Sequence, residues 1–228
     1  MRYIAALMAS NGTFVTGHHH GEAFGKLNDE EQNQEIRSGF LDPITGKFFG
    51  DDFECYVRKI MMIRHGEYHR DNSVDPGMNQ NGFNQIRRTA QHLVTSDLSS
   101  YQAYTSPYLR CLQTAQILSC ICKIKFIVEP LIGEEVDADC VIPARQQEFS
   151  EFKWPDKEEF AFTKETSETF STRINGLLEN LPPKSILICH CPVIYKISQL
   201  SLEQEDIDPH IPHGSLTFIE DHKVVWLG

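Results

Sequence analysis

Apolar runs of strand length alternate with segments of helical periodicity from residue 58 to the end of this 228-residue chain. The runs at 60–63 and 185–189 are almost entirely apolar, which is typical of strands buried on both faces of a sheet. Apolar residues at helical spacing predict helices over 82–94, 108–120 and 170–181, and another from about 193 to 200. Shorter strands are expected at 103–105 and 124–128, with a terminal hairpin at 216–219 and 223–226. This alternation predicts an α/β fold, a three-layer α/β/α arrangement around a mostly parallel central sheet.

Residues 1–57 carry a different pattern, and we interpret them as a small N-terminal extension. Asn11-Gly12 separates two short apolar runs, which favours a β-hairpin. A polar run over 28–38 begins with acids and is followed by Gly39, which suits a short exposed helix. The segment is too small and polar for a core of its own. We therefore expect a domain at 58–228 on which the extension packs, or whose site it gates.

The net charge limits which partners the protein can bind, and the cysteine content indicates the redox state of its compartment. A net charge of −11 and a pI near 5.3 argue against nucleic acid or an anionic membrane as the main partner. No apolar run approaches the roughly 18 residues of a membrane span, and the first residues are too short for a secretory signal. Seven cysteines, an odd number with close spacings, favour reduced thiols over a disulfide framework. We expect a cytoplasmic protein.

Candidate chemistry gathers where predicted strands end. In open α/β sheets this edge is the usual place for ligands. The first apolar strand runs directly into Arg64-His65-Gly66-Glu67, and the second into Cys189-His190-Cys191. The short strand at 103–105 leads into a third segment, which reads Ser106-Pro107-Tyr108-Leu109-Arg110-Cys111-Leu112-Gln113-Thr114-Ala115.

Together these motifs resemble the histidine phosphatase (phosphoglycerate mutase-like) superfamily. The matching features are Arg-His-Gly-Glu at 64–67, Ser-Pro-x-x-Arg-x-x-Gln-Thr-Ala at 106–115, and a late histidine, His190. Gly-x-x-Gln at 82–85 and Pro-His-Gly-Ser at 212–215 also fit. The resemblance runs from Val57 to the end, and it implies a phosphatase that needs no metal or other cofactor and acts on a phosphorylated small molecule or phosphoprotein.

The resemblance also implies a role for each site residue. His65 would attack phosphorus and form a phosphohistidine intermediate, which splits one difficult displacement into two easier steps. Arg64 and Arg110 would clamp the phosphoryl oxygens with fixed, always-charged donors, and His190 would bind the same oxygens as charge develops. Substrate contacts are expected from residues around this cage, namely Gly66, Glu67, Arg70, Glu135 and His213.

The proton donor for the leaving group is where the sequence departs from the family. A carboxylic acid is the usual donor, and in the family it follows a leucine by two residues. Here Leu131-Ile132-Gly133-Glu134-Glu135 places the acids later, with Glu134 preferred and Glu135 second. The segment after the first motif also lacks the mutase pattern, because Asn72 is shifted, and the stretch before His190 is short for a mutase. These points favour a compact phosphatase over phosphoglycerate mutase-like transfer.

Other interpretations remain open at this stage. Asp137-Ala138-Asp139-Cys140-Val141 fits a haloacid dehalogenase-type phosphatase, although no buried strand precedes it. A catalytically idle phosphatase fold used for protein interaction is a further alternative. His18-His19-His20 could bind a metal but reads better as an exposed loop. Specificity is expected from the loop segment 132–165, with Arg145, Phe149, Phe152 and Trp154.

Overall fold

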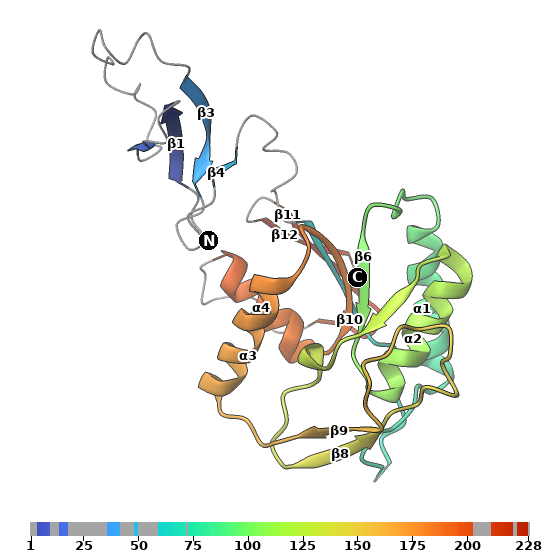
Figure 1. Cartoon of the computed structure of the whole chain (residues 1–228). Helices are drawn as coiled ribbons and strands as arrows, with labels where there is room; N and C mark the ends of the chain where they lie inside the picture. The colour runs from blue at the N-terminus through green and yellow to red at the C-terminus, as the bar shows by residue number, and fades with distance from the viewer. Residues whose placement is uncertain are drawn as a thin grey trace, which may run out of the picture. The chain divides into compact units, whose positions relative to one another are not determined.

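The structure is a computed structural model of the whole chain (Figure 1). It describes residues 4–9, 14–17, 36–41, 48–49, 59–71, 73–202, 211–220 and 223–227. The chain divides into two compact units, Met1–Val57 and Arg58–Gly228.

The N-terminal unit contains a four-stranded sheet of order β2-β1-β3-β4. Its strands are β1 (Ile4–Ala9), β2 (Phe14–Gly17), β3 (Ile36–Leu41) and β4 (Phe48–Phe49), with β1 antiparallel to β2 and to β3. The helix predicted over 28–38 is wrong at its end, because residues 36–38 belong to β3. Its remaining part, 28–35, lies outside the described residues. The polar pattern of this segment favours a helix only weakly, and pairing with β1 determines that residues 36–38 form a strand instead.

A six-stranded sheet of order β12-β11-β5-β10-β6-β7 forms the centre of the larger unit. Its parallel strands are β5 (Lys59–Arg64), β10 (Lys184–Cys189), β6 (Gln102–Thr105) and β7 (Phe126–Val128). The hairpin of β11 (Leu216–Glu220) and β12 (Lys223–Leu227) joins antiparallel at one edge. The predicted fold class, α/β with a mostly parallel central sheet, is confirmed.

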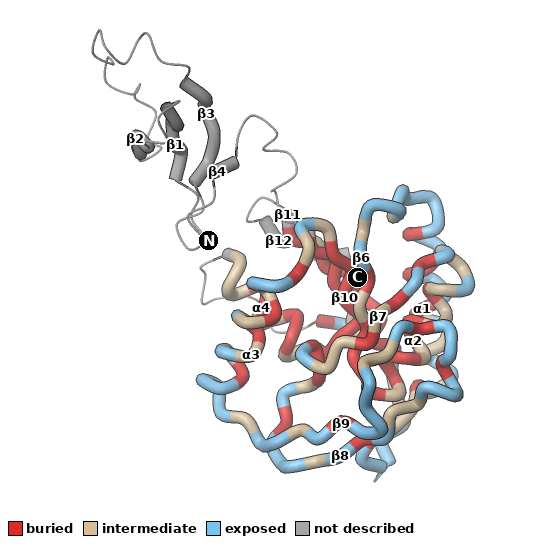
Figure 2. Tube along the Cα trace, viewed as in Figure 1, coloured by how far each residue is buried: buried red, intermediate tan, exposed pale blue. Residues whose placement is uncertain are grey.

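Helices cover both faces of this sheet, so the central strands are buried on both sides (Figures 1 and 2). Alternate residues of β5 belong to different cores, with Met61 and Ile63 in one and Ile60 and Met62 in the other. The first core is filled by α1 (Gln80–Leu93) and α2 (Leu109–Cys122), and the second by α3 (Ser167–Asn180) and α4 (Cys191–Leu202). This is why both central strands read as continuous apolar runs.

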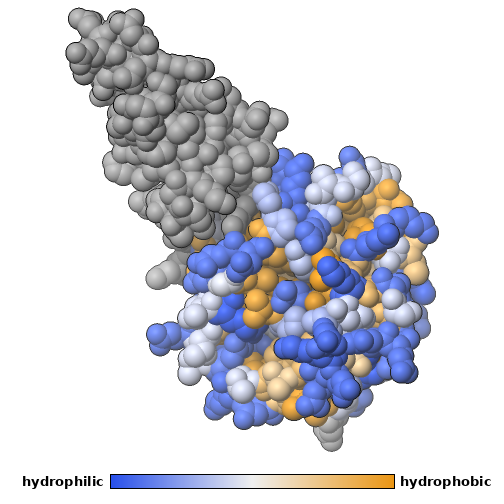
Figure 3. Space-filling model, viewed as in Figure 1, coloured by the Kyte–Doolittle hydropathy of each residue, from blue (hydrophilic) through white to orange (hydrophobic). Residues whose placement is uncertain are grey.

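Within the larger unit, a 3-10 turn and a β-ribbon were not predicted from the sequence. The segment between β7 and α3 contains a 3-10 turn, η3 (Pro130–Ile132), and a two-stranded ribbon of β8 (Cys140–Pro143) and β9 (Glu159–Phe162). The ribbon strands are short, and one includes a proline, so local pattern gives little signal. Charged and polar side chains cover much of the face of the larger unit seen in Figure 3, between smaller apolar areas.

None of the described helices is long and apolar enough to cross a membrane. Five described cysteines, at positions 111, 120, 122, 140 and 189, carry free thiols. Of these, Cys120 and Cys122 lie in the last turn of α2.

Candidate active site

The two predicted histidines meet at the carboxyl end of the parallel sheet. β5 and β10 pair in register to Arg64 opposite Cys189, and one more bond joins the His65 amide to the Cys189 carbonyl at 3.1 Å. His65 and His190 therefore follow neighbouring strands at the same edge, and their ring centroids are 5.2 Å apart. The side chains are 1% and 0% exposed, so both rings are held in a dry environment.

The position of the His65 ring is set by its own loop. Nδ1 lies 2.9 Å from the carbonyl oxygen of Gly66, and since that oxygen only accepts, Nδ1 carries the proton of the neutral ring. The remaining nitrogen, Nε2, then keeps its lone pair. Burial, with a further contribution from the nearby Arg110 charge, lowers the pKa of His65 well below its ordinary value. The ring is therefore neutral and nucleophilic at neutral pH.

Gly66 lets this loop approach α1 closely. A Cβ at this position would lie 2.6 Å from the Gly82 carbonyl oxygen and 2.6 Å from the sulfur of Met78, which no side chain tolerates. The Gly66 amide faces Thr114 Oγ1 at 3.3 Å. Glu67, predicted to contact substrate, accepts instead from Asn79, the N-cap residue of α1, at 2.9 Å. In this structure Glu67 thus holds the start of α1.

Arg64 and His213 form the second side of the site. The Arg64 guanidinium donates to the Ile211 carbonyl, and its Nη2 lies 3.0 Å from Nε2 of His213. Gly214, at φ +75°, turns the chain after His213, whose ring centroid is 5.4 Å from that of His65. Burial and the adjacent Arg64 lower the pKa of His213 to about 4, so it accepts from Arg64 as a neutral ring.

Arg110 lies at the start of α2 and reaches the centre of the site. Its side chain is 3% exposed and donates to the Glu134 carboxylate, while Nη2 lies 3.3 Å from Nδ1 of His190. The guanidinium carbon is 4.6 Å from the Tyr108 ring and 5.1 Å from the Tyr68 ring. These aromatic faces fix the plane of a cation that is otherwise costly to bury.

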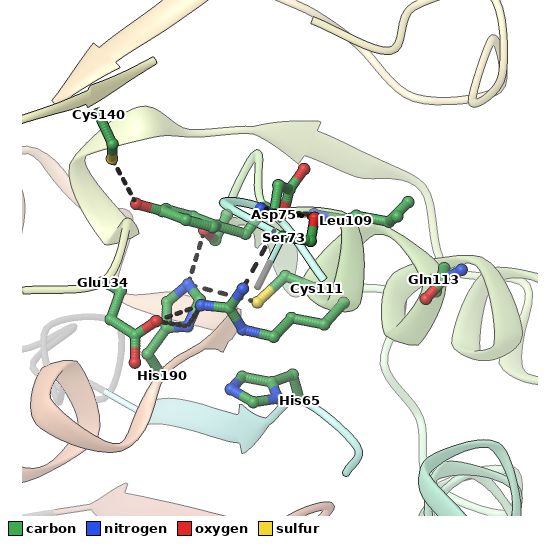
Figure 4. A network of polar contacts seen from close by, with 12 residues as sticks. His65, Ser73, Asp75, Leu109, Cys111, Gln113, Glu134, Cys140 and His190 are labelled. Atoms are coloured by element: carbon green, nitrogen blue, oxygen red, sulfur yellow. Dashed lines mark hydrogen bonds and ion pairs between the residues drawn. The ribbon is translucent and has the colours of Figure 1, made fainter. Parts of the chain in front are cut away.

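Of the two candidate acids, only Glu134 reaches the site. One of its carboxylate oxygens faces His190 Nδ1 at 3.6 Å, and Figure 4 shows the carboxylate turned toward that ring. Glu135 is exposed in the same loop. Arg70 is also exposed, and its charge is one of the influences that lower the pKa of His213. Of the predicted residues, Glu134 and His213 thus join the two histidines and two arginines, whereas Glu135 and Arg70 lie at the solvent-exposed surface.

Sequence reasoning missed Asp75, which lies behind Arg110. Its Oδ1 accepts from the Leu109 amide at 2.8 Å and lies 4.0 Å from Arg110 Nη1, and its Oδ2 lies 3.6 Å from Arg145 Nε. Burial raises the pKa of Asp75, opposed chiefly by the Leu109 amide. Asp75-Pro76-Gly77 reads as ordinary turn chemistry in the sequence, so no local signal indicated the contact with Arg110.

Three neighbours of the histidines were also not singled out. Ser106 Oγ lies 2.9 Å from His190 Nε2, and Tyr68 packs edge-on against His65 at 5.4 Å between centroids. Tyr108 packs edge-on against His190 at 5.1 Å. Ser106 and Tyr108 lie within the predicted 106–115 motif, whereas the signal for Tyr68 was only its place directly after Glu67.

Other expectations for the loop segment 132–165 need correction. Phe149 and Phe152 are 4% and 5% exposed and belong to the core shared with α1 and α2, so they are structural rather than substrate-facing. Asp137 and Asp139 are exposed in a turn before β8, not at the end of a buried strand, which removes the basis for a dehalogenase-type site. Trp154 donates to the Phe149 carbonyl.

No group of three or more metal-ligating side chains occurs among the residues that the structure describes. His18-His19-His20 lie outside them, as does Asn72.

Comparisons with known proteins show the family and the fold of this chain. The sequence profile of the histidine phosphatase superfamily (branch 1) matches residues 60–197. A search of curated protein sequences found no match.

Several solved structures share the fold at low sequence identity. The ecdysone phosphate phosphatase of Bombix mori, in complex with tungstate, is 16% identical, with a TM-score of 0.55 over 75% of this chain and 92% of that one. The mycobacterial glucosyl-3-phosphoglycerate phosphatase is 16% identical, with a TM-score of 0.51 over 71% and 89%. A putative phosphohistidine phosphatase, SixA, of Agrobacterium tumefaciens is 13% identical, with a TM-score of 0.51 over 75% and 96%.

Proposed function

The chain belongs to branch 1 of the histidine phosphatase superfamily, and we propose that it hydrolyses phosphomonoesters, or phosphohistidine, through a phosphohistidine intermediate on His65. The observation that carries this proposal is the convergence of His65, His190 and Arg110 on one small volume at the sheet edge. Two cationic forks and two neutral imidazoles suit a dianion whose charge grows on three equatorial oxygens during transfer.

In the first step, the Nε2 lone pair of His65 attacks phosphorus while the bond from phosphorus to the leaving oxygen breaks. Arg64 and Arg110 bind the phosphoryl oxygens, and substrate phosphate takes the place that the Glu134 carboxylate occupies beside Arg110. Protonated Glu134 gives its proton to the leaving oxygen, which departs as an alcohol. His65 now carries the phosphoryl group on Nε2.

In the second step, water attacks phosphorus and breaks the phosphorus–nitrogen bond. The Glu134 carboxylate left by the first step takes the proton of this water, which yields inorganic phosphate and restores both His65 and the acid. No atom in either step requires a metal ion, and we propose that the reaction is independent of metals. The free thiols support a reducing, cytoplasmic setting for it.

The direct test is capture of the intermediate. Purified protein is mixed with ³²P-labelled phosphomonoester and quenched in alkali, because phosphohistidine survives alkali and is lost in acid. We expect label on the wild-type chain and none on His65→Ala, whose phosphatase activity should be abolished. The matched control is His92→Ala, which removes an exposed histidine at the end of α1 and should leave labelling unchanged.

Full activity of His65→Ala on every hydrolysed substrate would contradict the mechanism. Unlabelled wild-type protein under conditions of turnover would contradict the intermediate while leaving hydrolysis intact. Addition of a chelator should change neither labelling nor rate, and loss of activity on chelation would contradict metal independence.

A further inference from the structure

Arg173 of α3 is wrapped around the loop that carries Glu134. Its two Nη atoms donate to three carbonyl groups of that loop. The distances are 2.6 Å to Leu131, 3.1 Å to Gly133 and 3.4 Å to Glu134. One side chain thus holds the backbone from Leu131 to Glu134, the candidate acid.

Glu165, just before α3, holds Arg173 from the opposite side. Its two oxygens accept from Arg173 Nε at 2.7 Å and from Nη2 at 2.6 Å, a bidentate geometry. The five contacts together match the five N–H donors of a guanidinium. The two side chains are only 15% and 12% exposed, so the pair is largely desolvated and costly to break from one side.

The rest of the loop is anchored on the same helix. Ile132 is fully buried in the core that contains Phe170, and the Arg173 guanidinium lies 5.0 Å from the Phe170 ring. The Glu165 amide donates to the Val136 carbonyl at 3.0 Å. Backbone on both sides of Glu134 is therefore attached to the start of α3, while the Glu134 carboxylate points the other way, to Arg110 and His190.

From this geometry we propose that Arg173, oriented by Glu165, is a positioning residue that sets where the Glu134 carboxyl group meets the leaving oxygen. The proposal rests on the function proposed above for Glu134. A donor displaced by a fraction of a hydrogen-bond length loses its proton transfer, whereas Arg64 and Arg110, which bind the phosphate, come from β5 and α2 and not from this loop.

Two substrates that differ in how much their leaving group needs a proton can distinguish a residue that positions the acid from one that only supports the fold. We compare kcat/KM for 4-nitrophenyl phosphate, whose product is a stable anion, with kcat/KM for phenyl phosphate, whose phenol has a pKa of about 10. Only the second substrate needs a proton in the first step. For Arg173→Met we expect kcat/KM to fall about 100-fold on phenyl phosphate, the lower range of general acid catalysis, and less than about threefold on 4-nitrophenyl phosphate.

Four further variants make the result specific. Glu134→Gln should show the same selective loss, and the double variant Glu134→Gln/Arg173→Met should lose little more than either single one, because both changes remove one interaction. Arg173→Lys, which keeps the charge but not the fork, should fall between wild type and Arg173→Met. Arg88→Met, an exposed arginine on α1, is the matched control and should leave the ratio of the two substrates unchanged.

Inhibition by inorganic phosphate reports whether the phosphate cage is intact in each variant. If Arg173→Met does not fold, Glu165→Gln and Arg173→Lys are tested in its place. In these variants we expect a smaller selective loss of kcat/KM on phenyl phosphate. Equal losses on both substrates in a folded variant would overturn the positioning role of Arg173. A Glu134→Gln variant without leaving-group selectivity would instead overturn the acid assigned in the proposed function, and the positioning role with it.

Discussion

Nδ1 of His190 lies 3.3 Å from Nη2 of Arg110, and this contact determines which nitrogen of the buried histidine carries the proton. A guanidinium only donates, so Nδ1 accepts, and the proton of the neutral ring lies on Nε2. From there it is directed at Ser106 Oγ, 2.9 Å away. Burial, with help from the Arg110 charge, lowers the pKa of His190 well below its ordinary value and keeps the ring neutral.

Replacement of His190 tests its part in stabilising transferred charge. In His190→Ala we expect kcat/KM to fall about 10²- to 10³-fold, because the ring no longer orients the Arg110 guanidinium that binds the developing negative charge. Ser106→Ala removes the hydroxyl that accepts the ring proton and should cost about 1–2 kcal/mol of unfolding free energy with a much smaller loss of rate. Steady-state kinetics and urea unfolding measure both. Wild-type kcat/KM in His190→Ala would show that the ring is structural.

The acid side of the pH–rate profile should report His65. Attack needs a neutral ring, and the pKa of His65 is well below the ordinary value of 6.5. Activity should therefore persist through the range in which an ordinary histidine becomes protonated, and kcat/KM should decline only below it. The profile is measured with 4-nitrophenyl phosphate, which depends least on the proton donor. An acid limb centred near pH 6.5 would contradict the neutral, buried His65.

Gly66→Ala should damage both stability and activity. The added methyl group would lie 2.6 Å from the Gly82 carbonyl oxygen, which belongs to the backbone of α1 and cannot move aside cheaply. We expect a loss of about 1–3 kcal/mol in unfolding free energy from this overpacking, and reduced activity because the His65 ring is held by the Gly66 carbonyl. Gly176→Ala is the control, since a Cβ there meets nothing within 4 Å. Equal stability of the two variants would contradict the expected clash.

Stability itself should fall in mild acid. His65, His190 and His213 all have pKa values lowered by burial, so the unfolded chain binds protons near pH 6.5 that the folded chain does not. Their contribution is fully present above about pH 6.5 and is lost as the pH decreases, for His213 down to about 4. Urea unfolding at pH 7.5 and at pH 5 measures this loss. His213→Gln should reduce the difference between the two values, and an unchanged difference would contradict the role of this ring.

Much of the larger unit could be predicted because its pattern is local. Strands such as β5 and β10 are apolar throughout because both faces are buried, and this shows directly in the sequence. The edge that carries His65 and His190 follows, since parallel strands end together. The β8–β9 ribbon could not be found in this way, because its short strands have little periodicity and owe their pairing to each other.

The sequence by itself determined the order of the main strands and helices of the larger unit and the convergence of the two motif histidines, His65 and His190, at one sheet edge, because motifs that follow neighbouring parallel strands must end together. Only the tertiary structure decided between Glu134 and Glu135, one facing Arg110 and the other solvent. Only the tertiary structure placed Asp75 behind Arg110. It also placed Arg173 against the loop that carries Glu134. These contacts join residues far apart in the chain, and a charged residue in a turn or a helix carries no local mark of the partner it will meet after folding.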